Sequence, residues 1–354
     1  MHVIFSLSSG GAEKVVLNLC NEQVKNNDVI LLTVLKGNKK NSFFSPMLDK
    51  GIKHVSLNSK RGFTLMNFFK FYKIVNENQP EVIHYHLNTI VYGFLISFLK
   101  RKLKLIHTLH SLAQYSTGFK VQKFLNRWFY KSNRIIPVAL SNECSDSISE
   151  IYGINESEII INGVPEFKKS KDFDNSLNFF QILRRKDNVI IYVHVARYDD
   201  KIKNQKLLFS TFNDLISQNN LIHLIIIGRD YPVLNYPNFH FLGEISNPVD
   251  YVINSDAFVL SSIYEGVPMS VLEAFSCGIP VLSTPAGGLI DILNNEELGV
   301  ISEDFSQEKF KDALDKMNFK LLNNKFDSEK IKFIFKNLYS IDKCSKKYLK
   351  IYKS

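Results

Sequence analysis

Two glutamates spaced eight residues apart mark the part of this 354-residue chain best suited to chemistry. Glu265 follows a short apolar stretch, and Glu273 lies in a helical pattern that begins near Pro268, a residue that fits the first turn of a helix. Gly266 and Pro268 set a turn, so we expect both carboxylates to face one cleft and to accept hydrogen bonds from sugar and ribose hydroxyls. Unrelated surface carboxylates are the alternative, but the Cys-Gly-Ile-Pro segment at 277–280 argues against coincidence.

Two basic residues could supply the matching cations. Arg197 and Lys203 follow an apolar strand pattern and precede a helical one, a place where arginine can grip two phosphate oxygens and lysine can add a point charge. Lys201 is a second candidate lysine. We favour Lys203, since it lies next to the helical pattern from Asn204, whose positive start favours an anion. In isolation, a solvated basic loop is the simpler interpretation.

A glycine pair, Gly10 and Gly11, stands between the first apolar strand pattern and the first helical one. Paired glycines let a backbone approach an anion closely, and the free amides at a helix start favour negative charge. The spacing matches neither a dinucleotide fingerprint nor a P-loop, so a plain strand-to-helix turn is an equally good interpretation.

His84 and His86 end a strand pattern, and alternation puts both rings on one face. A metal site needs a third ligand, and none is evident in the sequence. Asp199 and Asp200 are adjacent and would point apart on a strand. We therefore predict no metal and no cofactor.

The elements that carry these residues alternate between short apolar runs and longer helical patterns, which predicts an α/β fold with doubly wound parallel sheets. Expected strands are 2–6, 29–35, 82–86, 104–108, 135–139, 189–195, 221–227, 257–260 and 280–283. Expected helices are 12–25, 65–76, 204–218, 270–275, 307–317 and 341–354.

Length and this restart of the alternation predict two domains. We expect a first Rossmann-like domain at 1–168, joined by the lysine-rich final helix at 341–354. A polar stretch at 169–186 is expected to be a linker, and 187–340 the second Rossmann-like domain. Ligands of such folds bind beyond the carboxyl ends of the strands.

Charge is unevenly distributed along the chain. The net charge is +9, but residues 1–171 hold 23 Lys and Arg against 12 Asp and Glu, whereas the remainder holds 21 against 23. This asymmetry indicates an anionic partner for the first half. Nucleic acid is one candidate, without any helix-turn-helix, RNP or zinc pattern to support it. The segments 61–72 and 118–134 interleave aromatic and basic residues, which suits an anionic membrane surface better, with an ordinary solvated helix face as the alternative.

Four scattered cysteines without a CxxC pair suit a reducing compartment, and no basic leader is apparent. The longest apolar run, 90–99, is about half of what a membrane span needs. We expect a cytoplasmic protein, at most peripheral at the inner face of the cell membrane.

Taken together, the motifs resemble the retaining GT-B glycosyltransferases of family four, the group 1 transferases. The resemblance covers about residues 8 to 300, and its most specific part is E-G-x-P-x-x-x-x-E-A at 265–274. The other matching segments are G-G-A-E at 10–13, I-x-N-G-V at 160–164, I-I-I-G at 225–228, F-L-G at 241–243, S-D-A at 255–257, C-G-x-P-V at 277–281 and A-G-G at 286–288.

The resemblance implies roles for matching positions only. Arg197 and Lys203 would hold the donor diphosphate, Glu273 the ribose, and Glu265 with the amides after it the donor sugar. His110, which matches the family's T-x-H histidine, would hold the sugar, and Gly11 would cap the phosphates. The implied substrate-contacting set is completed by Gly10, Gly266, Val267, Pro268, Met269, Ser270 and Asn162.

Two departures from the family pattern are visible. The usual gap from arginine to lysine is five residues, whereas Lys201 and Lys203 lie four and six residues after Arg197. Asp291 also stands where the segment after the double glycine usually ends in glutamate.

The resulting expectation is an enzyme that moves a hexose or N-acetylhexosamine from a nucleotide-diphosphate sugar, expected to be a UDP-sugar, to a glycan or polyprenyl-linked acceptor with retention. The family's frequent role suggests bacterial surface polysaccharide synthesis: capsule, O-antigen or lipopolysaccharide. Another GT-B reaction, such as NDP-sugar epimerisation, is the enzymatic alternative, and a basic nucleic-acid-binding protein is the alternative from another class.

Overall fold

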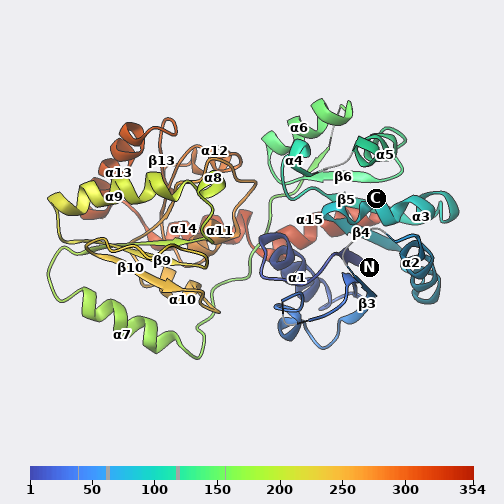
Figure 1. Cartoon of the computed structure of the whole chain (residues 1–354), viewed down its shortest axis with the longest axis horizontal. Coiled ribbons are helices and arrows are strands. Elements are labelled where there is room, and N and C mark those ends of the chain that lie inside the picture. The colour runs from blue at the N-terminus through green and yellow to red at the C-terminus, as the bar shows by residue number, and fades with distance from the viewer. Residues whose placement is uncertain (39, 61–63, 117–119, 156) are drawn as a thin grey trace. The chain divides into compact units, whose positions relative to one another are not determined.

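A computed structural model describes residues 1–38, 40–60, 64–116, 120–155 and 157–354. The chain forms two compact units (Figure 1). The first comprises Met1–Gly163 and Ile341–Ser354, and the second comprises Val164–Ser340.

The first unit is built on a parallel sheet of seven strands in the order β3-β2-β1-β4-β5-β6-β7. Its strands are β1 (His2–Ile4), β2 (Ile30–Leu35), β3 (Lys53–Ser59), β4 (Val82–His86), β5 (Lys104–Thr108), β6 (Ile136–Ala139) and β7 (Glu158–Ile159). Its helices are α1 (Gly11–Gln23), α2 (Leu65–Asn78), α3 (Gly93–Leu99), α4 (Ala113–Ser116), α5 (Lys120–Lys131), α6 (Asn142–Tyr152) and α15 (Ile341–Lys353), with 3₁₀ turns at Ser45–Met47 and Leu87–Tyr92. The order reverses beside β1, so β1 and β4 border the switch point where doubly wound folds bind ligands.

The second unit has a parallel six-stranded sheet in the order β10-β9-β8-β11-β12-β13. Its strands are β8 (Ile190–Val195), β9 (Ile222–Ile227), β10 (Phe239–Gly243), β11 (Ala257–Leu260), β12 (Val281–Ser283) and β13 (Gly299–Ile301). Its helices are α7 (Phe173–Leu183), α8 (Asp200–Lys203), α9 (Gln205–Gln218), α10 (Val249–Val252), α11 (Met269–Ser276), α12 (Leu289–Leu293), α13 (Gln307–Leu322) and α14 (Ser328–Leu338). Here the switch point lies between β8 and β11.

Local sequence explains several helix ends. The Ser306 side chain accepts a hydrogen bond from the Lys309 amide and starts α13, and Asp327 does the same for α14 through the amides of Glu329 and Lys330. Gly153 ends α6 in the left-handed conformation, φ +62°, which costs glycine little. These signals lie in the sequence itself.

The final helix, α15, belongs to the first unit, although more than half of the chain separates it from the strands it covers (Figure 1). Its buried residues Cys344, Tyr348 and Ile351 share a cluster with Leu19 of α1 and Ile106 of β5. The prediction that the last helix packs on the first domain is thus confirmed.

The stretch expected to be a linker has another structure. Residues 173–183 form α7, and its Ser176 is fully buried, donating a hydrogen bond to the Asp250 carbonyl at 3.0 Å. The chain leaves the first unit between Gly163 and Val164, earlier than the expected end at residue 168. Phe173 and Phe180 are buried seven residues apart, a helical spacing that the many polar residues around them concealed in the sequence.

No helix in the described residues is both long enough and apolar enough to span a bilayer.

Candidate functional site

The loop after β8 carries the first group of predicted residues in the second unit. Arg197 is exposed and forms an ion pair with Asp199 at 2.9 Å between Nη2 and Oδ2. The buried Gln205 holds this loop, because its Oε1 accepts from the Asp199 amide and its Nε2 donates to the Arg197 carbonyl. The loop is therefore shaped by a residue outside the motif, and the guanidinium remains accessible.

Lys203 ends the single turn of α8 and directly precedes Asn204, the N-cap of α9, which adopts the left-handed conformation at φ +50°. Its ammonium lies 2.5 Å from Glu265 Oε1, and both side chains are largely buried. Lys201, the other candidate, is exposed on the same turn. The structure thus brings Lys203 and not Lys201 against the carboxylate of the glutamate motif.

Glu265 lies in the loop between β11 and α11, and its Oε1 also accepts a hydrogen bond from Ser262 Oγ at 2.6 Å. The backbone of this loop is tied to α8, since Ser261 Oγ donates to the Lys203 carbonyl and the Ile263 amide donates to the Ile202 carbonyl. The ion pair is consequently built into the contact between two strand-end loops.

Glu273 lies in α11 and is 9% exposed, the same fraction as Glu265. Pro268 has extended backbone and caps the helix, so the first helical residue is Met269 rather than Pro268. Val267 and Met269 are buried, whereas Gly266, Pro268 and Ser270 keep partial exposure. The motif therefore buries its apolar positions and leaves its small ones accessible.

A glycine at the end of β9 lets a third loop approach this site. Gly228 has φ +153°, and a Cβ at this position would lie 1.8 Å from the Ala196 carbonyl oxygen, next to Arg197. Any side chain would force the two strand ends apart. This contact explains why the I-I-I-G segment ends in glycine.

The charge of this region also affects a neighbouring core group. Burial lowers the pKa of His194 in β8 to about 4; the hydrogen bond of its Nδ1 with the Val259 carbonyl opposes that shift, and the Lys203 charge adds to it. His194 is therefore neutral at physiological pH, and the charges beside β8 and β11 come from Arg197, Lys203 and the carboxylates.

In the first unit, Gly10 is the N-cap of α1 and Gly11 its first residue. A Cβ on Gly10 would clash with the Glu13 carboxylate, at 2.2 Å from Oε2, whereas a Cβ on Gly11 would meet nothing within 4 Å. A Cβ on Gly10 would therefore move the end of the Glu13 side chain, whose Oε1 accepts a hydrogen bond from Ser8 Oγ, whereas the space in front of Gly11 is open.

His110 follows β5 and is half-buried. Its Nε2 lies 3.1 Å from His86 Nδ1 at the end of β4, and His86 Nε2 lies 3.1 Å from His2 Nδ1 in β1. Burial lowers the pKa of His110 to about 3, with His107 adding to the shift, and burial lowers that of His2 to about 3 as well. The histidine that the resemblance singles out therefore belongs to a larger neutral cluster.

This cluster corrects one step of the sequence reasoning. We found no third ligand for His84 and His86, but His2 supplies one: ring nitrogens of the three lie within 4.8 Å of one another. His2 lies on the neighbouring parallel strand and pairs with His84. A single sequence does not reveal which strands are neighbours, so this ligand could not be found from the sequence.

The remaining predicted positions divide between the units. Asn162 is buried in the last segment of the first unit, next to Gly163. Asp291 is in the first turn of α12. The aromatic and basic segments at 61–72 and 118–134 lie partly outside the described residues, because 61–63 and 117–119 are not described.

Sequence reasoning missed three polar residues that build the second-unit site. Gln205 organises the Arg197 loop, Ser262 hydrogen-bonds Glu265, and Thr284 after β12 donates to the Ser262 carbonyl at 2.5 Å. Each of the three follows a strand or starts a helix, and this position in the sequence could have identified them as candidate site residues.

The arrangement fits the recognition of an anionic group carrying hydroxyls. Two cations lie at the carboxyl end of β8, and a carboxylate lies beside one of them in a partly buried setting where electrostatic interactions are strengthened. Cations placed in advance in this way can stabilise a departing phosphate without reorganisation.

Comparisons with known proteins agree with this chemistry. Residues 174–330 match the model described as glycosyl transferases group 1, and residues 9–166 match glycosyltransferase family 4, so the two models together match most of the chain. The chain is 26% identical over 293 residues to the UDP-Gal:alpha-D-GlcNAc-diphosphoundecaprenol alpha-1,3-galactosyltransferase of Escherichia coli, covering 77% of this chain and 73% of that one.

Two further matches add to this. The O-antigen biosynthesis glycosyltransferase WbnH of Escherichia coli is 26% identical over 304 residues, with 82% of each chain covered. Among solved structures, Anabaena HepE in complex with UDP and glucose superposes with a TM-score of 0.76 at 15% identity, over 100% of this chain and 98% of that one. This likeness shows the GT-B fold.

The two family models, the glutamate motif and the paired Rossmann-like units lead to one conclusion: the chain belongs to the group 1, family four glycosyltransferases and is a glycosyltransferase of the GT-B fold.

Proposed function

We propose that the chain transfers a hexose or N-acetylhexosamine from a UDP-sugar to a polyprenyl-linked glycan, with retention, in the synthesis of a bacterial surface polysaccharide. The observation that supports this most is the Lys203–Glu265 ion pair at the junction of two strand-end loops. We assign its ammonium to the diphosphate and its carboxylate to the sugar. The names of the relatives support the acceptor class, since one acts on a diphosphoundecaprenol-linked sugar.

In the proposed reaction, the bond between the sugar C1 and the β-phosphate oxygen breaks, and its electron pair leaves with the phosphate. A hydroxyl oxygen of the acceptor forms its bond to C1 on the same face, and its proton passes to the departing phosphate oxygen. Arg197 and Lys203 stabilise the charge that develops on the diphosphate, which is the main catalytic contribution we assign to the chain. His110 holds the sugar, and Gly11 leaves room for the phosphates.

We propose no metal and no cofactor for this step, since two cationic side chains are available at the diphosphate. Glu273 accepts the ribose hydroxyls, as an acidic residue does in dinucleotide-binding folds. When the donor binds, Lys203 exchanges part of its contact with Glu265 for the diphosphate, and Glu265 accepts hydrogen bonds from the sugar hydroxyls.

The test is a panel of UDP-, GDP- and ADP-sugars, first by thermal shift, because a bound donor raises stability by RT ln(1+[L]/Kd). Transfer to a synthetic polyprenyl-diphosphate sugar then follows, with the product anomer read by NMR. We expect donor consumption only with acceptor present and a product of the donor's anomeric configuration. Consumption without acceptor and a new sugar epimer would indicate an epimerase, and an inverted anomer would refute retention.

A polyprenyl-linked acceptor requires the enzyme to work at a membrane, and the first unit has a surface suited to this. Helices α2, α3 and α5, with the 3₁₀ turn before α3, enclose a groove of about 630 Å³ that is almost wholly apolar. Its lining residues are Leu65, Phe68, Phe69, Val91, Phe94, Leu95, Val121, Gln122 and Leu125. We call these three helices and their groove the apolar-basic surface.

The exposed side chains of this surface have the composition of an interfacial membrane anchor. Phe69 and Phe124 are 64% and 70% exposed, and Trp128 stacks on Phe98 with ring centroids 5.1 Å apart. Basic residues alternate with them on α5, and α2, α3 and α5 together hold 6 Lys and Arg against 1 Glu. Aromatic residues partition into the headgroup region, and the basic residues attract anionic lipids.

We therefore propose that this surface rests on an anionic lipid bilayer at the inner face of the cell membrane. Sedimentation with phosphatidylglycerol vesicles should bind the wild type, and phosphatidylcholine vesicles should bind it weakly. Phe69→Ser with Phe124→Ser should lose most of the binding, whereas Phe333→Ser, equally exposed at 68% in the second unit, should keep it. Equal loss in all variants, or preferential binding of RNA over vesicles, would refute the proposal.

A further inference from the structure

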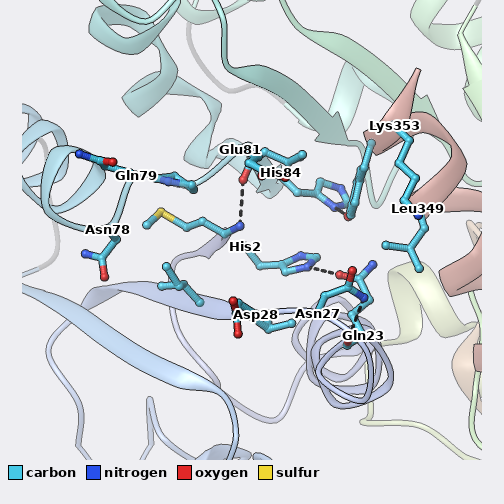
Figure 2. Close-up of a pocket in the computed structure, with 16 residues that line it drawn as sticks. His2, Gln23, Asn27, Asp28, Asn78, Gln79, Glu81, His84, Leu349 and Lys353 are labelled. Atoms are coloured by element: carbon cyan, nitrogen blue, oxygen red, sulfur yellow. Dashed lines mark hydrogen bonds between the residues drawn. The ribbon is translucent and has the colours of Figure 1, made fainter.

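Two buried histidines, the half-buried His110 and a glutamine form a continuous hydrogen-bonded chain through the first unit. Gln23 Oε1 lies 2.9 Å from His2 Nε2, a contact drawn as a dashed line in Figure 2. His2 Nδ1 lies 3.1 Å from His86 Nε2, and His86 Nδ1 lies 3.1 Å from His110 Nε2. The chain runs from α1 across β1 and β4 to the residue after β5.

In such a chain, all hydrogen bonds must be donated in the same direction at any one time. A neutral imidazole has one N–H donor and one bare nitrogen acceptor, so each ring that receives a hydrogen on one side must give one on the other. The rings are kept neutral by burial, which lowers the pKa of His86 well below its usual value, with further lowering by the surrounding histidines. The group at one end therefore determines the tautomer of every ring.

Gln23 is the end that sets the direction. Its oxygen faces His2, so His2 must donate from Nε2. Gln23 Nε2 makes no hydrogen bond of ordinary geometry to a described residue, yet the Gln23 side chain lowers the pKa of Tyr352, which burial raises well above its usual value. An amide N–H turned toward the Tyr352 hydroxyl has this effect. The contact between Gln23 Oε1 and His2 Nε2 is thus the observation that sets the direction of the chain.

His84 supports the chain without being part of it. Its ring lies 4.0 Å from that of His86, and its own nitrogens are within 2.7 Å of the Tyr352 hydroxyl and of Thr108 Oγ1. The anchored His84 ring, tilted by 36° against that of His86, keeps the His86 ring in place. Because His2 and His86 are at most 3% exposed, water competes little for their hydrogen bonds.

We propose that Gln23, His2 and His86 hold His110 as the tautomer with hydrogen on Nε2 and a bare Nδ1, and that His2 and His86 are positioning residues for sugar transfer. The bare Nδ1 can accept a hydrogen bond from a hydroxyl of the donor sugar, and it has no hydrogen that would repel one. The tautomer follows from the chain alone, while its role in the reaction rests on the function proposed above for His110.

The same residues could be interpreted as a metal site, because His2, His84 and His86 converge. A metal would have to replace the His2–His86 hydrogen bond and at least one of the two anchors of His84. The side chains that hydrogen-bond to the three rings are His110, two hydroxyls and an amide, and none of these carries a negative charge that would offset that of the ion. The hydrogen-bonded chain uses every ring nitrogen of His2 and His86 as it stands.

The direct test is NMR of ring ¹⁵N nuclei in the full-length protein labelled at histidine, with His110 assigned through His110→Gln. We expect the His110 Nδ1 shift of an unprotonated nitrogen and the Nε2 shift of a protonated one, at pH 7.5 without ligand. A hydrogen on Nδ1, or a charged ring, would overturn the proposal. This readout needs no activity, so it stands even if no donor is found.

Enzyme variants test the role in the reaction. His86→Ala removes the acceptor for His110, and we expect kcat to fall about 10-fold or more, as losses of such orienting partners do, while the KM for the donor changes less than about threefold. His86→Asn keeps an acceptor near the Nδ1 position and should recover most of kcat. The matched control is His240→Asn, which disrupts another histidine pair, His223–His240 at 3.0 Å in the second unit, and should stay within about twofold.

Two outcomes would overturn the positioning role while leaving the transferase function intact: full activity in His86→Ala, or equal losses in His86→Ala and His86→Asn with an unchanged His110 tautomer. Zinc titration of the wild type tests the alternative that His2, His84 and His86 bind a metal ion. Stoichiometric Zn²⁺ binding that His2→Ala abolishes would show a metal site in place of the chain. If His86→Ala fails to fold, the tautomer measured in the wild type decides.

Discussion

The two units use opposite electrostatics at the carboxyl ends of their sheets. In the second unit the groups are charged and pair with one another, Lys203 with Glu265 and Arg197 with Asp199. In the first unit they are His86 and His110, which burial keeps neutral. The difference shows that one α/β architecture can be adapted to a charged ligand or to neutral hydrogen bonding, depending on how deeply the strand-end groups are buried.

The whole-unit charges do not follow this local pattern. The first unit carries 25 Lys and Arg against 12 Asp and Glu, and the second carries 19 against 23. The positive excess of the first unit lies on its surface, much of it on the apolar-basic surface, while its interior is neutral. The second unit has two cations at its site, each paired with a carboxylate, in a slightly negative whole. The charge that we propose for a membrane and the charge that we propose for a diphosphate therefore belong to separate features.

The largest expected effect concerns the charged site. Lys203→Ala should lower kcat on the order of 100-fold, because one cation placed for the departing diphosphate is lost and Glu265 remains without its partner. Lys201→Ala, on the same turn but exposed, should stay within about threefold. Both variants are measured at saturating donor. If Lys201→Ala were inactive and Lys203→Ala active, Lys201 and not Lys203 would be the lysine that contacts the diphosphate.

Glu273→Ala probes the same unit by binding alone. We expect the affinity for UDP to fall about 10- to 100-fold, the range for hydrogen bonds that involve a charged group. Isothermal titration with UDP and with the intact donor should show similar losses, since the ribose is common to both. An unchanged affinity for UDP would remove the ribose assignment, and normal thermal stability of the variant serves as the control.

Lowering the pH should destabilise the first unit, with its neutral histidines, before the second unit. The pKa of His2 is about 3 and that of His107 about 4 in the folded chain, against about 6.5 when unfolded, so unfolding takes up protons below pH 6.5. Stability is retained above pH 6.5 and is lost as the pH falls from there toward 3, by about 2 kcal/mol for each such histidine at pH 5.

Hydrogen exchange at pH 7.5 and 5.0, corrected for the intrinsic rate, measures this unit by unit. Peptides from β1, β4 and β5 should lose protection before those from β9 and β11, because the second unit has one fully buried histidine, His194, among the described residues. Equal losses in both units would contradict the contrast drawn between them.

Gly11→Ala separates fold from function at the start of α1. A Cβ there meets no atom within 4 Å, so the thermal midpoint should stay within a few degrees. The kcat/KM for the donor should fall about 10-fold if the phosphates approach this backbone. Gly10→Ala is the companion variant, because its Cβ would only require the end of the flexible Glu13 side chain to move and should also cost little stability. Full activity of Gly11→Ala would exclude the phosphate role.

The smallest expected effect is that of metal removal. With Arg197 and Lys203 neutralising the diphosphate, excess EDTA should leave the rate unchanged within error. A loss of activity that Mn²⁺ or Mg²⁺ restores would show that a divalent cation shares this task and would weaken the contrast between the two units.

Much of this protein could be predicted from local sequence alone. Strand 82–86 and strand 104–108 coincide with β4 and β5, and the helix at 307 begins where Ser306 caps it. Periodicity and capping act within a few residues, so they survive in the sequence. The family motif likewise indicated the second-unit site, because its turn and helix are contiguous.

Other features depend on contacts between residues far apart in the chain. Phe173 and Phe180 make a helix of the expected linker because they pack in the second unit, where Phe180 lies against Tyr251. His2 meets His86 because β1 pairs with β4, and Gln205 reaches Arg197 because α9 turns back on its loop. Strand order and the burial it produces bring these side chains together, and neither is encoded in local spacing. The sequence by itself therefore determined the elements and the motif, while the tertiary structure alone decided which polar groups share a hydrogen bond and which of them remain charged.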